Sequence, residues 1–271
     1  MYQEFYGLKE KPFNVTSDPA FFFQSSAHQE ALTHLMYGVQ QRKGIIVISG
    51  EIGSGKTTLC RVFLNKAKQD NIKTAFIINP NFSTKELLEA IVTDFGIAVT
   101  KRTKLSLVDQ LNHFLLQESG HGNNAVLIID EAQNLRPSQM EEIRLLSNLE
   151  TDKEKLLQIA LIGQPELKQK LRLDSLVQLQ QRVVVQYHMR PLVRRELSDY
   201  IDYRLVTAGA AQGRIDFSSE AQDLIYSFTM GTPRLINVIC DRCLLAGFVA
   251  QANTIDLAIV QKSIKELRPE R

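Results

Sequence analysis

Five short apolar runs, each bounded by glycine or polar residues, stand out in the first 190 residues of the chain. The first run, IIVIS, is rich in β-branched residues and leads directly into a glycine-rich loop. Each run is apolar on both faces, which is typical of strands buried inside a parallel sheet. The pattern therefore predicts strands at residues 45–49, 74–79, 125–130, 156–163 and 182–189.

The segments between these runs have the apolar spacing of helices. Strands that alternate with helices are typical of a parallel sheet covered by helices on both faces. We therefore expect an α/β core over residues 41–191. Its helices are expected to begin near Lys56, Thr84, Leu105 and Ser138.

The N-terminal segment differs from this core. It is rich in aromatic residues and contains Pro12 and Pro19, which predicts an ordered, extended arm. The stretch SSAHQEALTHLMYGVQQR then places Leu32 and Val39 on one face, and a serine before it can cap a helix. We expect residues 1–40 to form an arm followed by a helix.

The pattern changes again after Pro191. Four stretches have helical periodicity and are separated by glycines, Pro233 and short polar turns: RRELSDYIDYRLVTAG, SSEAQDLIYSFT, TPRLINVICDRCLLAGFVA and IDLAIVQKSIKEL. They predict a small all-helical domain over residues 192–271. The predicted fold class is therefore α/β, with a five-stranded parallel sheet flanked by helices and followed by a small all-helical lid domain.

Composition narrows the class of protein. The 271 residues are 44% hydrophobic and 23% charged, as in ordinary globular proteins, and the net charge of +2 gives no electrostatic argument for nucleic acid or an anionic membrane. The apolar run CLLAGFVA is far shorter than the ~20 residues of a membrane-spanning helix, and the start lacks the pattern of a signal peptide. Three cysteines at no disulfide-framework spacing fit a reducing compartment. We expect a cytoplasmic protein with no transmembrane segment in this chain.

The stretch GEIGSGKTT matches the phosphate-binding pattern G-x-x-x-x-G-K-[ST]. In such a loop backbone N–H groups surround the phosphates, the lysine reaches the β and γ oxygens, and the hydroxyl helps to hold Mg²⁺. The strand before it and the helix after it are the required context. A plain glycine turn is the alternative, but a chance match in a chain of this length arises only about once in a hundred. The expected nucleotide-binding residues of the loop are Gly50, Glu51, Ile52, Gly53, Ser54, Gly55, Lys56, Thr57 and Thr58.

An acidic pair ends the third apolar run, in LIIDEAQNL. Asp130, at the end of a buried strand, can hold Mg²⁺ together with Thr57. Glu131 can orient and deprotonate a water that attacks the γ-phosphate, or it can be merely a charge at a helix N-terminus. The preceding phosphate loop favours hydrolysis, since a small-molecule kinase has less use for a water-activating carboxylate here.

The long separation between the phosphate loop and Asp130 bears on the strand order. The run at 74–79 falls between them in the sequence. This leaves room for a strand inserted, in space, between the phosphate-loop strand and the acidic strand. Such an arrangement is expected by analogy with the additional-strand class of P-loop ATPases.

Three further polar residues stand where a nucleotide can be sensed. Gln164, after the fourth run, can sense the γ-phosphate or position the water, or it is a turn residue. Arg182 is either a solvated strand boundary or an arginine finger that reaches the γ-phosphate of a neighbouring subunit. Arg234 follows Pro233 at a helix start, where the dipole disfavours a cation unless an anion is near. A surface ion pair is the alternative for Arg234.

The remaining candidates are interpreted structurally. Cys240 and Cys243 form C-x-x-C inside an apolar helix without a second ligand pair, which indicates buried packing rather than a metal site. The charged stretches TKRTK and RPLVRREL are expected to be solvated surface rather than contacts to nucleic acid or lipid. The five histidines have no metal-ligand spacing.

With these motifs in order, the chain resembles the AAA+ ATPases. It resembles most closely the ExeA/GspA family of general secretion pathway ATPases. The likeness rests on FYGLKEKPFNVTSDPAFFFQSSAHQEALTHLMYGVQQRKG, which leads into GEIGSGKTTLCR. It continues through LIIDEAQNL, IALIGQPEL, LQQRVVVQYHMRPL and GTPRLINVICDRCL and covers nearly the whole chain.

The resemblance implies binding and hydrolysis of ATP with Mg²⁺, self-assembly into a homo-oligomer with sites shared between subunits, and a role in assembling envelope machinery such as a secretion system or pilus. A membrane-associated partner protein is implied as well. The arm and first helix around His28 would flank the adenine, with Pro233 and Arg234 also at the nucleotide. The implied catalytic set is Lys56, Glu131, Gln164, Arg182 and Arg234, and the implied metal ligands are Thr57 and Asp130.

One departure from the family limits this transfer. Members often continue into a transmembrane segment and a periplasmic peptidoglycan-binding part, and this sequence stops at Arg271 without either. The chain is therefore expected to be the cytoplasmic portion of an inner-membrane protein or a stand-alone relative, so cell-wall binding is not carried over. The fold also resembles ATPases that assist DNA transposition. An ATP-gated DNA-binding adaptor is thus an alternative function, and a slow-hydrolysing nucleotide switch is another, against which Glu131 argues.

Overall fold

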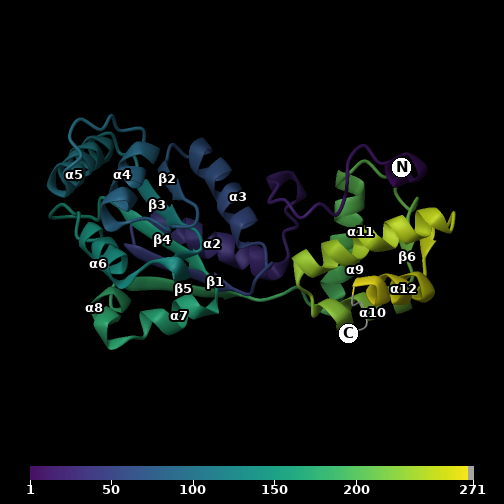
Figure 1. The fold of residues 1–271 in the computed structure, drawn as a ribbon. Coiled ribbons are helices and arrows are strands. Elements are labelled where there is room, and N and C mark those ends of the chain that lie inside the picture. The colour runs from purple at the N-terminus through teal and green to yellow at the C-terminus, as the bar shows by residue number, and fades with distance from the viewer. Residues whose placement is uncertain (268–271) are drawn as a thin grey trace. The chain divides into compact units, whose positions relative to one another are not determined.

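The computed structural model describes residues 1–267 and divides the chain into two compact units (Figure 1). The sheet unit comprises Gln29–Ile52 and Lys56–Met189. The helical unit comprises Met1–His28, Gly53–Gly55 and the chain from Arg190 onward. The helical unit is therefore discontinuous in sequence, because the sheet unit is inserted between its two main parts.

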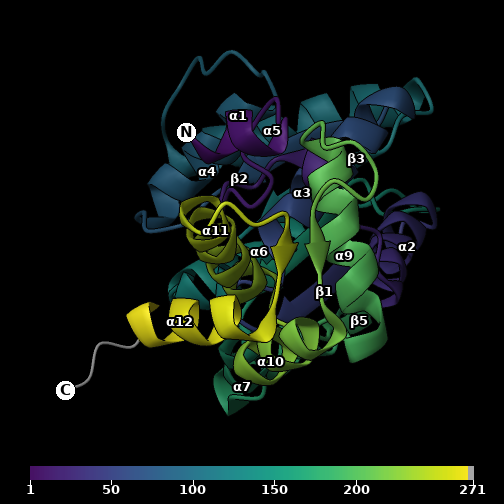
Figure 2. The same cartoon turned by 90° about the vertical axis from the view of Figure 1, so that its right-hand side faces the viewer.

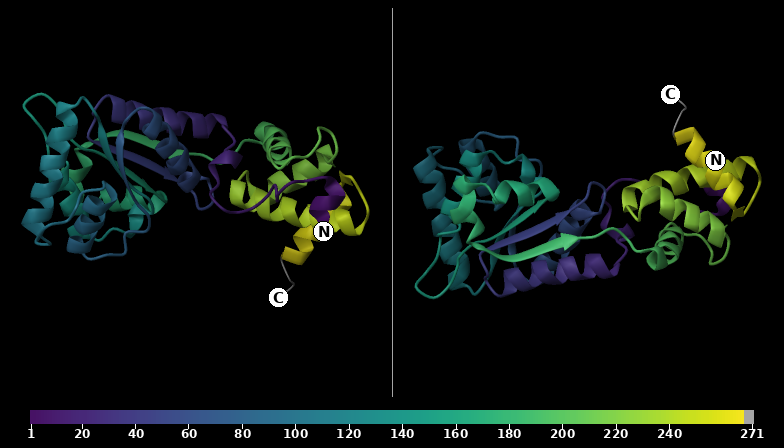
Figure 3. Two further views of the ribbon diagram at one scale, coloured as in Figure 1. Left: turned by 90° about the horizontal axis from the view of Figure 1, so that it is seen from above. Right: turned by 90° about the horizontal axis from the view of Figure 1, so that it is seen from below.

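The sheet unit is built on a five-stranded parallel sheet with the order β2-β3-β4-β1-β5 (Figure 1). Figure 3 shows the ribbon from above and from below. Every residue of β1, β3 and β4 is buried, which explains why these runs are apolar on both faces. The predicted five-stranded parallel sheet is confirmed. Its strands are β1 (Ile45–Gly50), β2 (Lys73–Ile77), β3 (Ala125–Ile129), β4 (Gln158–Gly163) and β5 (Val183–Met189).

A strand does lie between the phosphate-loop strand and the acidic strand, but it is β4, from later in the sequence. Its Leu161 pairs with Val47 on one side and Ile129 on the other. The run at 74–79 instead forms the edge strand β2, which is only partly buried, as an edge permits. The amide of Phe76 is satisfied there by the Asp94 carboxylate, at 2.5 Å from Oδ2.

The helices of the sheet unit begin within a residue of the predicted starts. Side-chain caps fix two of these starts: Ser83 accepts from the amide of Glu86, and Thr103 accepts from that of Ser106. The short helices α7 and α8 were not predicted, because they span too few residues to show a period. The helices are α2 (Ser26–Gln40), α3 (Lys56–Gln69), α4 (Thr84–Asp94), α5 (Lys104–Gly120), α6 (Pro137–Leu146), α7 (Pro165–Leu171) and α8 (Val177–Gln180).

The helical unit contains the four predicted helices, which are labelled in Figure 2. The region is not entirely helical, however: β6 (Asp216–Phe217) and β7 (Thr254–Ile255) form a parallel pair. Strands of two residues carry no periodic signal, so the sequence did not reveal them. The last four residues of the predicted 192–271 domain lie outside the described residues. The helices are α9 (Arg194–Thr207), α10 (Ser219–Thr229), α11 (Pro233–Val249) and α12 (Leu257–Leu267).

The N-terminal arm belongs to the core of the helical unit. It is not simply extended, since it contains the helix α1 (Tyr2–Tyr6) and a 3₁₀ turn at Pro19–Phe21. Its aromatic residues Tyr6, Phe13 and Phe21 are buried among residues of α9, α10 and α11. Burial of these rings explains the aromatic richness of the arm.

A buried arginine on α9 fixes the arm in place. Arg204 donates from Nε to the carbonyl oxygen of Pro12 at 2.6 Å and from Nη2 to that of Asn14 at 3.0 Å. Its guanidinium also lies over the ring of Phe21, 4.8 Å from the centroid. None of the helices within residues 1–267 is long and apolar enough to cross a membrane.

Candidate nucleotide-binding site

The phosphate loop joins the end of β1 to the start of α3. Gly53 and Gly55 have φ angles of +78° and +94°, in the region that favours glycine. A Cβ at Gly55 would lie 2.8 Å from Nε2 of His28, and one at Gly53 would lie 2.6 Å from Cβ of Arg234. Both glycines are therefore required by backbone conformation and by close packing.

Lys56 folds back over the loop that precedes it. Its Nζ donates to the carbonyl oxygens of Gly50 and Glu51, each at 2.8 Å. Burial lowers the pKa of Lys56, whereas the carboxylates of Glu131 and Asp130 favour its charged form. The ammonium group is thus held among acceptors at the mouth of the loop.

Thr57 and Asp130 lie in direct contact. Thr57 Oγ1 donates to Asp130 Oδ2 at 2.6 Å, and the other carboxylate oxygen accepts from the amide of Glu131 at 2.9 Å. Asp130 is buried at the end of β3, and this burial raises its pKa, partly offset by these two hydrogen bonds. The hydroxyl and carboxylate predicted to share a metal are therefore neighbours.

The ammonium, hydroxyl and carboxylate groups described above fit a nucleotide with bound Mg²⁺. Mg²⁺ prefers oxygen ligands and is usually held by one or two carboxylates together with substrate phosphates, which matches Thr57 and Asp130. The N-terminus of α3 and Lys56 provide positive charge for phosphates. Ser54 Oγ, in the same loop, is buried without a hydrogen-bond partner among residues 1–267 and can serve as a further donor.

Glu131 and Gln164 are brought together, as expected for residues at the ends of neighbouring strands. Gln164 Nε2 donates to Glu131 Oε2 at 3.0 Å. Glu131 has a φ of +52°, an uncommon conformation for a residue with a side chain. This conformation turns the chain sharply after β3 and sets the direction of the carboxylate.

The structure adds Gln133 to this group, a residue that the sequence reasoning missed. Its Nε2 donates to the same Oε2 of Glu131 at 2.5 Å, and its Oε1 accepts from the amide of Gln164 at 3.0 Å. Its position two residues after Glu131 was the only signal in the sequence, and that signal does not show where the side chain points.

His28 contacts the backbone of the phosphate loop. Its Nε2 lies 2.9 Å from the carbonyl oxygen of Ser54, and its Nδ1 lies 2.6 Å from Ser25 Oγ. A carbonyl oxygen only accepts, so Nε2 carries the proton and Nδ1 accepts from the hydroxyl. Burial lowers the pKa of His28, in keeping with a neutral ring. That His28 also flanks adenine stays a prediction.

Arg234 lies at the start of α11, behind Pro233. Its backbone amide donates to the carbonyl oxygen of Gly53 at 3.2 Å, which places this helix start at the tip of the phosphate loop. The side chain is exposed and makes no ion pair with any residue that the structure describes. The alternative of a surface ion pair therefore gains no support.

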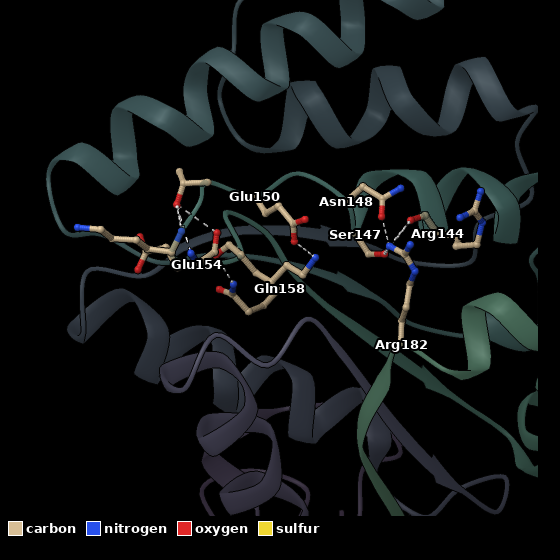
Figure 4. A network of polar contacts seen from close by, with 10 residues as sticks. Arg144, Ser147, Asn148, Glu150, Glu154, Gln158 and Arg182 are labelled. Carbon is tan, nitrogen blue, oxygen red and sulfur yellow. Dashed lines mark hydrogen bonds and ion pairs between the residues drawn. The ribbon is translucent and has the colours of Figure 1, made fainter.

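Arg182 is anchored at the C-terminal end of α6 (Figure 4). Its Nη1 donates to Ser147 Oγ at 3.0 Å, to Asn148 Oδ1 and, at 3.5 Å, to the carbonyl oxygen of Arg144. The negative end of the helix dipole favours a cation there. Arg182 is thus held by its own chain, and none of its contacts with described residues involves the phosphate loop or the acidic pair.

The cysteines match their structural interpretation. Cys240 and Cys243 are buried in the core of the helical unit and carry free thiols, and Cys60 is a free, buried thiol of the sheet unit. Burial raises the pKa of Cys243 to about 12, which disfavours the thiolate that a metal or a redox reaction needs.

Known proteins are similar to this chain in sequence. A family model described as an AAA domain matches residues 39–171. The general secretion pathway protein A of Aeromonas hydrophila is 40% identical over 274 aligned residues, which cover 100% of this chain and 50% of that protein. The chain therefore spans about half the length of the curated relative that it matches.

Solved structures share the fold. The ORC2 protein of Aeropyrum pernix, in its ADPNP–ADP complexes, has a TM-score of 0.67 at 16% identity and covers 95% of this chain and 72% of its own. Cdc6p from Pyrobaculum aerophilum has a TM-score of 0.67 at 18% identity, over 93% and 71%. The RuvB Holliday junction branch migration motor of Thermotoga maritima has 0.59 at 18% identity, over 89% and 70%.

The sheet order, the phosphate loop and these matches define the class: this is a P-loop protein with the AAA+ fold. Within that class the chain is an ExeA/GspA-like AAA+ protein, as its motifs indicated.

Proposed function

We propose that this protein is an Mg²⁺-dependent ATPase whose hydrolysis of ATP drives the assembly or remodelling of a bacterial envelope machine of the secretion-system or pilus type. The proposal of ATP hydrolysis rests on the contact between Thr57 and Asp130 and on the position of Glu131 directly after Asp130. The relation to a general secretion pathway protein supports the envelope role.

Residues of the sheet unit have separate roles in the proposed hydrolysis. Thr57 and Asp130 would hold Mg²⁺, which neutralises charge that develops on the phosphates. Lys56 leaves the carbonyl oxygens of Gly50 and Glu51 to reach the β and γ oxygens. Glu131 accepts the proton of the attacking water, which Gln164 helps to position.

Three residues of the helical unit are also assigned to the nucleotide in this proposal. His28, which contacts the Ser54 carbonyl, is assigned to adenine, and Pro233 and Arg234, next to Gly53 of the loop, are assigned to the nucleotide as well. Arg234 is exposed and unpaired among the described residues, which supports a contact with phosphate. The remaining residues of the loop, Ile52 and Thr58 among them, surround the phosphates with backbone amides.

Self-assembly with shared sites is the second part of the proposal. Arg182 would complete the site of a neighbouring subunit as an arginine finger, which is worth about 10³- to 10⁵-fold in rate in well-studied cases. Its anchoring at the end of α6 supports this role, because a finger must be held in a fixed direction. The free thiols support a reducing compartment, and thus the cytoplasm, as the location.

The test is the ATPase rate per subunit as a function of protein concentration, for the unaltered chain and for Arg182→Ala. We expect a specific rate that rises with concentration and collapses in Arg182→Ala. Arg172→Ala, at an exposed position of the same unit, is the matched control. A flat rate that is insensitive to Arg182 would rule out the shared site. Stimulation by DNA in a parallel series would favour the DNA-binding adaptor instead.

A further inference from the structure

Gln133 occupies the centre of a closed set of contacts between Glu131 and Gln164. Its amide nitrogen donates to Glu131 Oε2, and its amide oxygen accepts from the backbone N–H of Gln164. Gln164 in turn donates from its own side chain to the same Oε2 of Glu131. Each of the three residues is therefore bonded to the other two.

The backbone around Gln133 is held as firmly as its side chain. Gln133 lies in the 3₁₀ turn Ala132–Asn134, and Lys170, near the end of α7, donates to the carbonyl oxygens of Gln133 and, at 2.8 Å, of Leu135. Gln164 is the N-cap of that same helix. Both ends of α7 therefore contact this segment: the N-cap Gln164 bonds to Gln133, and Lys170 bonds to the carbonyl oxygens that follow.

The strand before Gln164 is shaped to admit the Gln133 side chain. A Cβ at Gly163 would lie 2.7 Å from Gln133 Oε1. Glycine at this position has a negative φ and is not required by backbone conformation. The absence of a side chain at Gly163 is explained by the approach of the Gln133 amide and, at 3.0 Å, of the Leu167 side chain.

We propose that Gln133 is a positioning residue that locks the carboxylate of Glu131 to Gln164, so that the water-activating base and the residue that helps to position the water move together. This inference rests on the proposed ATPase function. Its basis is the triangle of contacts, the turn held by Lys170 and the space left by Gly163.

The hydrogen bonds from Gln133 and Gln164 determine which carboxylate oxygen of Glu131 acts as the base. Oε2 accepts two N–H donors and has little lone-pair capacity left. Oε1 therefore receives the proton of the attacking water. The oxygen of that water bonds to the γ-phosphorus while the bond from this phosphorus to the β–γ bridging oxygen breaks, and ADP leaves with the electron pair of that bond. When the Gln164 side chain turns to the attacking water, Gln133 keeps its donor on Oε2 and its bond with the backbone N–H of Gln164, so the base keeps its direction.

Two substitutions separate the donor of Gln133 from its acceptor. Gln133→Leu removes both, whereas Gln133→Glu keeps an oxygen for the Gln164 amide but removes the donor and places a second carboxylate beside Glu131. Gln133 is half-buried and outside the hydrophobic core, so both chains are expected to fold. Gln169→Leu, at an exposed position of α7, is the matched control.

Steady-state kinetics with MgATP, at a protein concentration where the specific rate has reached its plateau, test the role in turnover. We expect kcat to fall roughly 10- to 100-fold in both variants, since small misplacements of a catalytic group cost this much, with KM changed less than about twofold. Gln169→Leu retains the rate. Combined with Glu131→Gln, the change Gln133→Leu causes no further loss, because its effect passes through Glu131.

Hydrogen exchange of the Gln164 amide in the nucleotide-free protein tests the lock without turnover. We expect faster exchange in Gln133→Leu and retained protection in Gln133→Glu. Unchanged exchange in Gln133→Leu, unchanged kcat in both variants, or an additive loss in the Glu131→Gln background would each overturn the inference. Absence of turnover in the unaltered chain would instead overturn the proposed function, which is a distinguishable result.

Discussion

Thr57 donates a hydrogen bond of 2.6 Å to Asp130, although 73 positions separate the two residues in the sequence. The contact forms because the phosphate loop follows β1, Asp130 follows β3, and the carboxyl ends of parallel strands meet at one edge of the sheet. Strand β4 separates β1 from β3, so side chains rather than backbone span the distance. The sheet order itself thus assembles the metal ligands of the proposed site.

Replacement of Lys56 tests the phosphate loop. Lys56→Ala removes the cation that is to reach the β and γ oxygens, so the affinity for MgATP should fall at least about tenfold, as expected when a charge-assisted contact worth about 1.5–3 kcal/mol is lost. Titration with a fluorescent ATP analogue measures this loss. Lys66→Ala, on the exposed face of α3, should bind normally. Unimpaired binding by Lys56→Ala would refute the assignment of the loop.

The base is tested by Glu131→Gln. The amide keeps the size of the side chain but accepts no proton, so turnover should fall about 10²- to 10⁴-fold while ATP binding is retained. Binding and single-turnover hydrolysis are measured on the same preparation. Glu166→Gln, at an exposed position of α7, should behave as the unaltered chain. Undiminished hydrolysis by Glu131→Gln would assign the base elsewhere.

Gly55→Ala should disable the loop for two separable reasons. Its φ of +94° is strained for alanine, and the new methyl group would lie 2.8 Å from His28 Nε2. The double change Gly55→Ala and His28→Ala relieves the clash but not the strain, so it should regain only part of the lost nucleotide affinity. Isothermal titration of both variants with MgATP distinguishes the two terms. Full recovery in the double variant would mean that the backbone conformation costs little.

The buried ring of His28 makes stability depend on pH. Burial lowers its pKa in the folded protein below the usual value of about 6.5, so the unfolded chain takes up a proton first as the pH falls. Stability from this group is therefore complete above about pH 6.5 and declines as the pH falls through the folded-state pKa. Denaturant unfolding at pH 7.5 and 5.5 should show a smaller decline in His28→Gln. His121→Gln, at an exposed position, should match the unaltered chain.

Arg204 should dominate the stability of the arm. Arg204→Met leaves the carbonyl oxygen of Pro12 without its donor and that of Asn14 with only the 3.4 Å bond from Asn237 Nδ2, at a cost of about 2–4 kcal/mol of unfolding free energy. Chemical denaturation measures the change, and the exposed Arg195→Met is the control. A change below about 1 kcal/mol would mean that aromatic packing and the other hydrogen bonds of the arm, such as that from Tyr6 to Ala252, are enough to hold it.

The sequence predicted the elements better than it predicted the neighbours of side chains. Runs apolar on both faces marked the five strands, and apolar spacing placed four helix starts of the sheet unit within one residue. The pair β6 and β7 was missed because two residues show no alternation. Gln133 was missed because its direction depends on the left-handed turn at Glu131, and a residue other than glycine gives no sign of such a turn in the sequence.

The discontinuity of the helical unit sets an order for its folding during synthesis. The arm leaves the ribosome before the sheet unit does, yet Tyr6 donates to the carbonyl oxygen of Ala252, 246 positions later. The rings of Tyr6, Phe13 and Phe21 therefore stay unburied during synthesis of the whole sheet unit. All segments of the sheet unit have been synthesised before the core of the helical unit can form. A nascent chain released after Met189 would present these three rings to solvent and to chaperones.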